Sequence, residues 1–125
     1  MDWVVQFGLI ELAIGGLLGW AMVVRDERPE WLRQIGVVAP QRIRQVHLDY
    51  VMMGLILIGV GLAVPDLPQA VAIALVFGTF VNPLLFVPLA FEPDAEKRLW
   101  YRALATVSFI ATSGGLVVAA IIGPG

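Results

Sequence analysis

Apolar residues gather into four blocks, each long enough to cross a lipid bilayer as a helix. A helix needs about 20 apolar residues to span roughly 30 Å of hydrocarbon, since it rises about 1.5 Å per residue. The blocks meet that length and take up most of the chain. We therefore expect one domain over residues 1–125, an all-α integral membrane four-helix bundle with helices at about 4–24, 40–64, 70–91 and 103–122.

The composition excludes an ordinary water-soluble domain. Hydrophobic residues make up 59% of the chain and charged residues 14%, whereas about a quarter of a typical soluble domain is charged. The amino terminus, Met1-Asp2-Trp3, lacks the basic residues of a cleavable signal peptide, so we expect the first helix to remain. The absence of cysteine excludes disulfides, thiolate chemistry and cysteine-ligated metal sites.

Positive charge is confined to two of the connecting segments, residues 25–45 and 92–102. All eight basic residues lie there: Arg25, Arg28, Arg33, Arg42, Arg44, Lys97, Arg98 and Arg102. Loops rich in lysine and arginine stay on the cytoplasmic side of a membrane. We therefore predict that both segments are cytoplasmic, that both termini are non-cytoplasmic, and that the protein is a multi-pass protein of the cell membrane, a bacterial inner membrane.

Prolines predict two features of the helices. Pro65 and Pro68 favour a tight turn, so the second and third helices should form an antiparallel hairpin. Pro83 and Pro88 lie inside the third apolar block and remove backbone N–H donors, so we expect a kink there.

Small residues predict where helices approach closely. Gly15 and Gly19 form a small-xxx-small face on the first helix, and Gly114 and Gly115 lie on the fourth. Such faces allow helix backbones to come near each other in a membrane. We expect close contacts at both places.

Ionisable side chains that lie inside the membrane are the candidate functional residues, because such groups are rare in membrane helices and usually face the protein interior. They are Glu11, His47 and Asp49, and the neutral amide of Asn82 joins them. Glu11 is interpreted either as a proton relay or substrate anchor, or as a protonated acid bonded to a neighbouring helix. Asp49 follows His47 by two residues and should point away from it on a helix.

His47 is the only histidine of the chain and has two interpretations. It is either a hydrogen-bonded structural residue near the membrane surface or the proximal ligand of a haem. In the second case, the guanidinium groups of Arg42 and Arg44 would pair with the haem propionates. A second axial ligand could come from Met22, Met52 or Met53, but flexible thioethers are ordinary packing residues.

Asn82 precedes the expected kink at Pro83. Its amide either makes a hydrogen bond between helices or supplies a donor and an acceptor to a pocket opened by the proline. A small proton-coupled carrier that uses Glu11 and Asn82 is a further interpretation of the same residues.

Two segments resemble a family of small four-helix membrane isomerases that contains styrene oxide isomerase and hydroxylaminobenzene mutase. Residues 46–54, VHLDYVMMG, are similar to the family pattern of a histidine, six residues and a glycine at the start of the second helix. Residues 77–82, FGTFVN, are similar to its segment with an aromatic residue, a glycine and an asparagine. Tyr50 and Met53 of the first segment are further candidates, and Met53 stands where the family commonly has an asparagine.

The resemblance implies a haem b cofactor, a homotrimer and a small hydrophobic substrate such as an epoxide or an N-hydroxylarylamine. It places His47 as the axial ligand and Asn82 near the substrate oxygen, with the iron acting as a Lewis acid. No nucleic acid is expected as a partner. The departure at Met53 leaves open a non-catalytic haem-binding or structural membrane subunit.

Overall fold

The computed structural model describes residues 2–125, and no strand occurs among them. The helices are α1 (Asp2–Glu27), α2 (Pro29–Gln34), α3 (Gln41–Ala63), α4 (Gln69–Leu84), α5 (Phe86–Phe91), the 3₁₀ helix η1 (Pro93–Lys97) and α6 (Leu99–Ile122). Four spans are long and apolar enough to cross a membrane, with α4 and α5 together forming the third. The all-helical prediction and the four apolar helices are confirmed, as in a multi-pass membrane protein.

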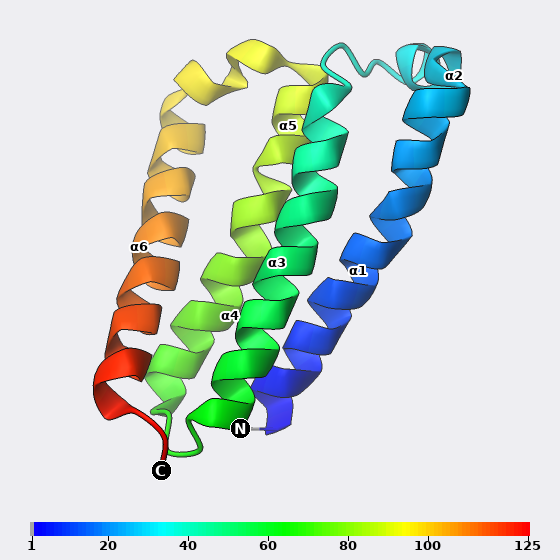
Figure 1. The fold of residues 1–125 in the computed structure, drawn as a ribbon. Helices are drawn as coiled ribbons and strands as arrows, with labels where there is room; N and C mark the ends of the chain where they lie inside the picture. Colours follow the sequence, from blue (N-terminus) through cyan, green and yellow to red (C-terminus); the bar gives the residue numbers. More distant parts are fainter. Residues whose placement is uncertain (1) are drawn as a thin grey trace.

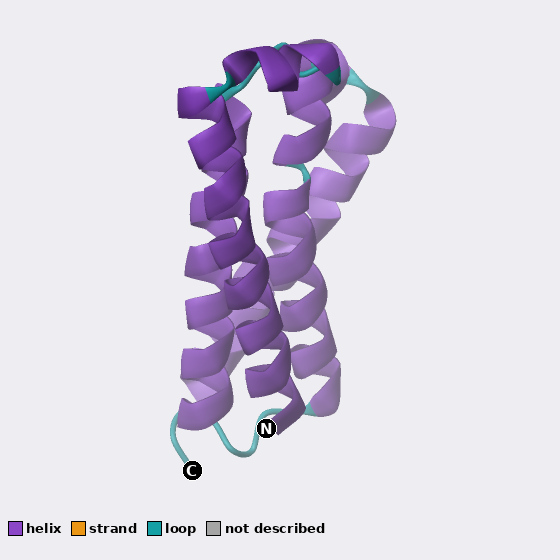
Figure 2. Ribbon diagram, turned by 90° about the vertical axis from the view of Figure 1, so that its right-hand side faces the viewer, coloured by secondary structure: helices purple, strands orange, loops and turns teal. Residues whose placement is uncertain are grey.

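The four long helices stand side by side, with both described chain ends at one end of the array (Figure 1). α1 packs against α3, α3 against α4, and α4 against α6. The short elements α2 and η1 lie at the opposite end (Figure 1), and Figure 2 likewise shows short helical segments at the end away from both chain ends. The contact of α3 with α4 confirms that the second and third predicted helices are neighbours.

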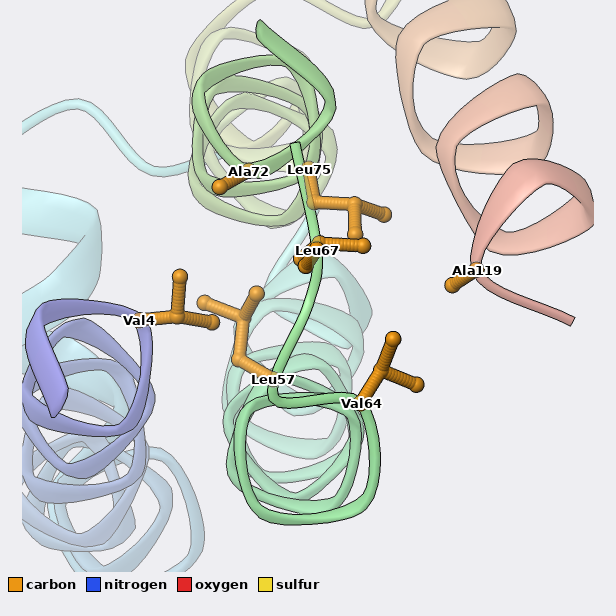
Figure 3. Close-up of a cluster of buried hydrophobic side chains, with 7 residues drawn as sticks. All are labelled: Val4, Leu57, Val64, Leu67, Ala72, Leu75 and Ala119. Carbon is orange, nitrogen blue, oxygen red and sulfur yellow. The ribbon is translucent and has the colours of Figure 1, made fainter. Parts of the chain in front are cut away.

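A hydrophobic cluster holds the helices together at the end where the chain termini lie. It comprises Val4, Leu57, Val64, Leu67, Ala72, Leu75 and Ala119 (Figure 3). Leu67, only 3% exposed, belongs to the turn between α3 and α4 and turns inward between its two prolines. The cluster therefore fixes the α3–α4 hairpin while it joins the hairpin to α1 and α6.

Glycines bring α1 and α3 into close contact. A Cβ at Gly15 would lie 2.9 Å from the Val51 nitrogen, and one at Gly61 would lie 3.2 Å from the Val5 nitrogen, so neither position has room for a side chain. Gly15 is thus a close-contact residue, as predicted. Gly19 has only the His47 ring nearby, at 3.6 Å.

The contact of α6 with α4 uses Gly115 and not Gly114. A Cβ at Gly115 would lie 2.6 Å from the Leu75 Cγ, whereas one at Gly114 would meet nothing within 4 Å. Gly78 of α4 faces Thr112 of α6 with equally little space.

The third apolar span is interrupted just after Pro83, where α4 ends at Leu84 and α5 begins at Phe86, whereas Pro88 lies inside α5. Two tyrosines bond to carbonyl groups beside this break. Tyr50 donates to the Phe80 carbonyl at 2.9 Å, and Tyr101 donates to the Leu85 carbonyl at 2.9 Å. A break in a membrane helix needs such partners, because hydrocarbon offers none to backbone polar groups.

Candidate functional site

His47 lies at the contact of α3 with α1. Its ring nitrogen Nδ1 is 2.6 Å from the carbonyl oxygen of Gly15. Because a carbonyl can only accept a hydrogen bond, Nδ1 carries the proton, and in the neutral ring Nε2 is the nitrogen with a free lone pair. A metal-ligating histidine usually donates from its second nitrogen in this way, and so does a structural histidine that joins two helices.

The backbone of α1 next to the His47 ring carries no side chain. Gly19, one turn along α1 from Gly15, presents no side chain to the ring, and a Cβ there would lie 3.6 Å from His47 Cε1. His47 itself is half-buried. A haem bound at this place would need only its one imidazole as a protein ligand.

The two arginines predicted to meet haem propionates lie on different faces of α3. Arg44 precedes His47 by three residues, so it shares that face, and it is exposed. Arg42 precedes it by five residues, and its Nη1 donates to Gln45 Oε1 at 2.7 Å, while its buried Nε has no partner. Of the two, the structure places only Arg44 on the face of His47.

Asn82 joins α4 to α6 through two hydroxyl groups. Its Nδ2 donates to Thr112 Oγ1 at 3.0 Å, and its Oδ1 accepts from Ser108 Oγ at 2.5 Å. Ser108 is fully buried and Thr112 nearly so. Sequence reasoning missed both partners, although their spacing of four residues places them on one face of α6.

A cleft of about 290 Å³ lies between α3, α4 and α6. Polar or sulfur-bearing groups reach it from each helix: Asp49, Met53, Asn82 and Tyr101. Leu85, Phe86 and Phe109 contribute apolar surface. Three residues predicted separately, Asp49, Met53 and Asn82, therefore share one cleft.

His47 and the cleft lie on opposite sides of α3. His47 contacts α1 through Gly15, while Asp49 faces the cleft with α6. The prediction that Asp49 points away from His47 agrees with this placement. One chain therefore presents two separate features, an imidazole beside α1 and a polar cleft beside α6.

Glu11 forms a third polar feature, deep between α1, α3 and α4. It is 0% exposed, and its Oε2 lies 2.9 Å from the hydroxyl of Thr79, which is also 0% exposed. Tyr50, 2% exposed, bonds to the Phe80 carbonyl and so does not line the cleft. Sequence reasoning missed Thr79, a neutral hydroxyl with no distinguishing pattern around it.

The described residues contain no group of three or more histidine, aspartate or glutamate side chains that could hold a metal ion. A metal held by several side chains of one chain is thus not supported by their arrangement, and a haem needs only one imidazole.

No known protein family matches this chain, and no curated protein or solved structure shows significant similarity to it.

Proposed function

We propose that this protein binds haem b through His47 and rearranges a small hydrophobic, oxygen-containing substrate as a membrane isomerase or mutase. The observation that carries the proposal is the 2.6 Å contact of His47 Nδ1 with the Gly15 carbonyl. It holds the imidazole in one orientation and leaves Nε2 as the ligating atom. Arg44 on the same face supplies a positive charge for a propionate.

The cleft between α3, α4 and α6 supports a small substrate that partitions into the bilayer. Its walls are largely apolar, and Asn82 uses one amide hydrogen for Thr112. The second amide hydrogen remains for a substrate oxygen. Bound haem supplies a Lewis acid, which stabilises negative charge that develops on that oxygen, so the reaction needs no nucleophilic side chain.

A homo-oligomer follows from the separation of the two features. A single chain cannot place His47 and Asn82 on the same substrate, because α3 stands between them. Two copies can, if the α1–α3 face of one lies against the cleft of the next. Cyclic symmetry then repeats the site at every interface, and the resemblance implies a trimer.

We propose that the helices form a bundle in the cell membrane, with both termini non-cytoplasmic. Both segments that carry the basic residues lie at the same end of the helix array (Figure 1). The positive-inside rule then assigns both segments to the cytoplasmic side of the membrane.

A specific observation favours a second candidate, a non-catalytic haem-binding or structural membrane subunit. Both polar atoms of the Asn82 amide already bond to α6, which is the pattern of an interhelical brace. Met53, in the cleft beside Asn82, donates no hydrogen bond to a substrate.

The absorption spectrum of the purified protein, expressed with haem supplied, tests haem binding. We expect a Soret band that disappears in His47→Ala while the helical circular dichroism stays unchanged. Added imidazole should restore the band in His47→Ala by occupying the space of the lost side chain, which a purely structural role would not produce. A wild-type protein without Soret absorption would exclude both haem-binding candidates.

Turnover separates the remaining alternatives. Haem-loaded protein should rearrange an epoxide or an N-hydroxylarylamine without net oxidation or reduction. Haem binding without turnover of either class would favour the non-catalytic subunit.

A further inference from the structure

Glu11 belongs neither to the His47 face nor to the cleft, yet it is one of the largest fully buried side chains of the chain. It comes from the middle of α1 and reaches Thr79 of α4. A fully buried carboxyl group in an apolar helix is costly unless it is neutral or paired. Its protonation state can be deduced from the atoms around it.

The hydroxyl of Thr79 lies within hydrogen-bond distance of three acceptors. Thr79 Oγ1 is 2.9 Å from Glu11 Oε2, 2.8 Å from the Leu75 carbonyl oxygen and 3.3 Å from the Val76 carbonyl oxygen. A hydroxyl has one hydrogen, so it can donate to only one of them. If Thr79 donates to Leu75, the hydrogen between Thr79 and Glu11 belongs to the carboxyl group.

The other carboxyl oxygen points to the same assignment. Glu11 Oε1 is buried and has no hydrogen-bond partner. In an ionised carboxylate this oxygen would carry about half of a negative charge with nothing to stabilise it. In a carboxylic acid it is a neutral carbonyl oxygen, for which a missing partner costs much less.

Within residues 2–125, no positive group is paired with Glu11. No salt bridge among the described residues includes it. The first basic residue of α1 is Arg25, about 21 Å further along the helix at 1.5 Å per residue. On α3, Asp49 acts on Glu11 electrostatically and is itself acidic, while the Nδ1–H of His47 is directed at the Gly15 carbonyl.

We infer that Glu11 is a buried proton-binding site: its carboxylic acid donates to Thr79 Oγ1, and Thr79 donates to the Leu75 carbonyl. The hydrogen bond of the neutral acid joins α1 to α4, and the acid keeps a transferable proton inside the helix array. The inference is independent of haem binding, because it uses neither the His47 ring nor the cleft.

Infrared spectroscopy of the wild-type protein at neutral pH tests the inference. We expect the carbonyl stretch of a protonated carboxyl group, and ¹³C-labelled glutamate should shift it to lower frequency. The chain has five glutamates, and Glu11 is the only fully buried one. This measurement uses only the wild-type protein, so it does not depend on how well a variant folds.

Three variants refine the assignment. Glu11→Gln should remove the band while keeping the helical content, because glutamine is neutral and of similar size. Thr79→Val should move the band to higher frequency, since the acid loses its acceptor, whereas Thr79→Ser should leave it in place. Asp49→Asn, a change at the half-buried carboxyl of α3, should leave the band intact.

The inference is overturned if the wild-type spectrum has no glutamate-dependent band of a protonated acid, or if such a band persists in Glu11→Gln. In the first case Glu11 is ionised and Thr79 donates to it.

Discussion

Gly8 of α1 and Gly54 of α3 face each other so closely that neither can carry a side chain. A Cβ at Gly54 would lie 2.8 Å from the Gly8 carbonyl oxygen, and a Cβ at Gly8 would lie 2.9 Å from the Gly54 carbonyl oxygen. This backbone contact sets the approach of the two helices. It thereby also sets the reach of His47 to the Gly15 carbonyl, two turns further along α1.

Gly54→Ala should destabilise the protein by about 1–3 kcal/mol, the usual cost of an extra methyl group in a fully packed contact. Gly59→Ala is the matched control, because a Cβ at Gly59 meets nothing within 4 Å. Equilibrium unfolding in mixed detergent measures both changes in the free energy of unfolding. Equal stability of the two variants would contradict the packing described for α1 and α3.

The four helices could be predicted from the sequence because long apolar runs report membrane spans directly. Which helices pack against each other could not be predicted from the sequence. Many glycines lie in the helices, and only the packed structure shows which of them contact the backbone of another helix. Gly15 does and Gly19 does not, although one motif contains both. Gly61, in no recognised motif, packs on Val5.

The residues of the candidate site also divide into those that the sequence could indicate and those that it could not. His47, Glu11 and Asn82 stand out because ionisable and amide groups are rare in apolar helices. Thr79 and Ser108 do not, because a hydroxyl in a membrane helix can bond to a carbonyl of its own preceding turn, as Thr106 does with Arg102 at 2.8 Å. Whether a hydroxyl also meets a second helix depends on tertiary packing alone.

Thr112→Val should weaken the contact of α4 with α6 by about 1–2 kcal/mol, since Asn82 Nδ2 loses its buried acceptor. Thr106→Val on the same helix removes an exposed hydroxyl with a similar backbone bond and should have little effect. Equilibrium unfolding in detergent measures the free energy of unfolding of both variants. A larger loss in Thr106→Val would show that Thr112 does not contribute through Asn82.

Asn82→Ala should keep the Soret band and lose turnover, because the amide is proposed to contact the substrate and lies across α3 from His47. Asn82→Asp retains the acceptor oxygen and tests whether the lost donor causes the effect. The absorption spectrum measures haem binding, and initial rates with an epoxide substrate measure turnover. Loss of haem in Asn82→Ala would contradict the separation of the two features.

Reporter fusions at Gly125 and near Arg33 test the membrane orientation. The positive-inside rule predicts a non-cytoplasmic reporter at Gly125 and a cytoplasmic one near Arg33. A cytoplasmic signal from the fusion at Gly125 would reverse the assignment. Replacing Arg25, Arg28 and Arg33 with glutamine should weaken the preference, because their charge determines it.

Mixed oligomers test whether His47 and Asn82 of different copies act on one substrate. His47→Ala and Asn82→Ala should each be inactive alone, since each lacks one part of every site. When both chains are co-expressed, some interfaces receive His47 from one chain and Asn82 from the other. In random assembly of equal amounts, about a quarter of the interfaces of a cyclic oligomer are intact in this sense.

Activity should therefore return in mixed oligomers, purified through a different affinity tag on each variant. Oligomers that carry the same variant on both tags are the control and should stay inactive. If mixed oligomers form and remain inactive, His47 and Asn82 do not share a site across copies. The opposite faces of α3 would then exclude any common action on one substrate, because within one chain the imidazole is held at Gly15 and the amide at Ser108 and Thr112.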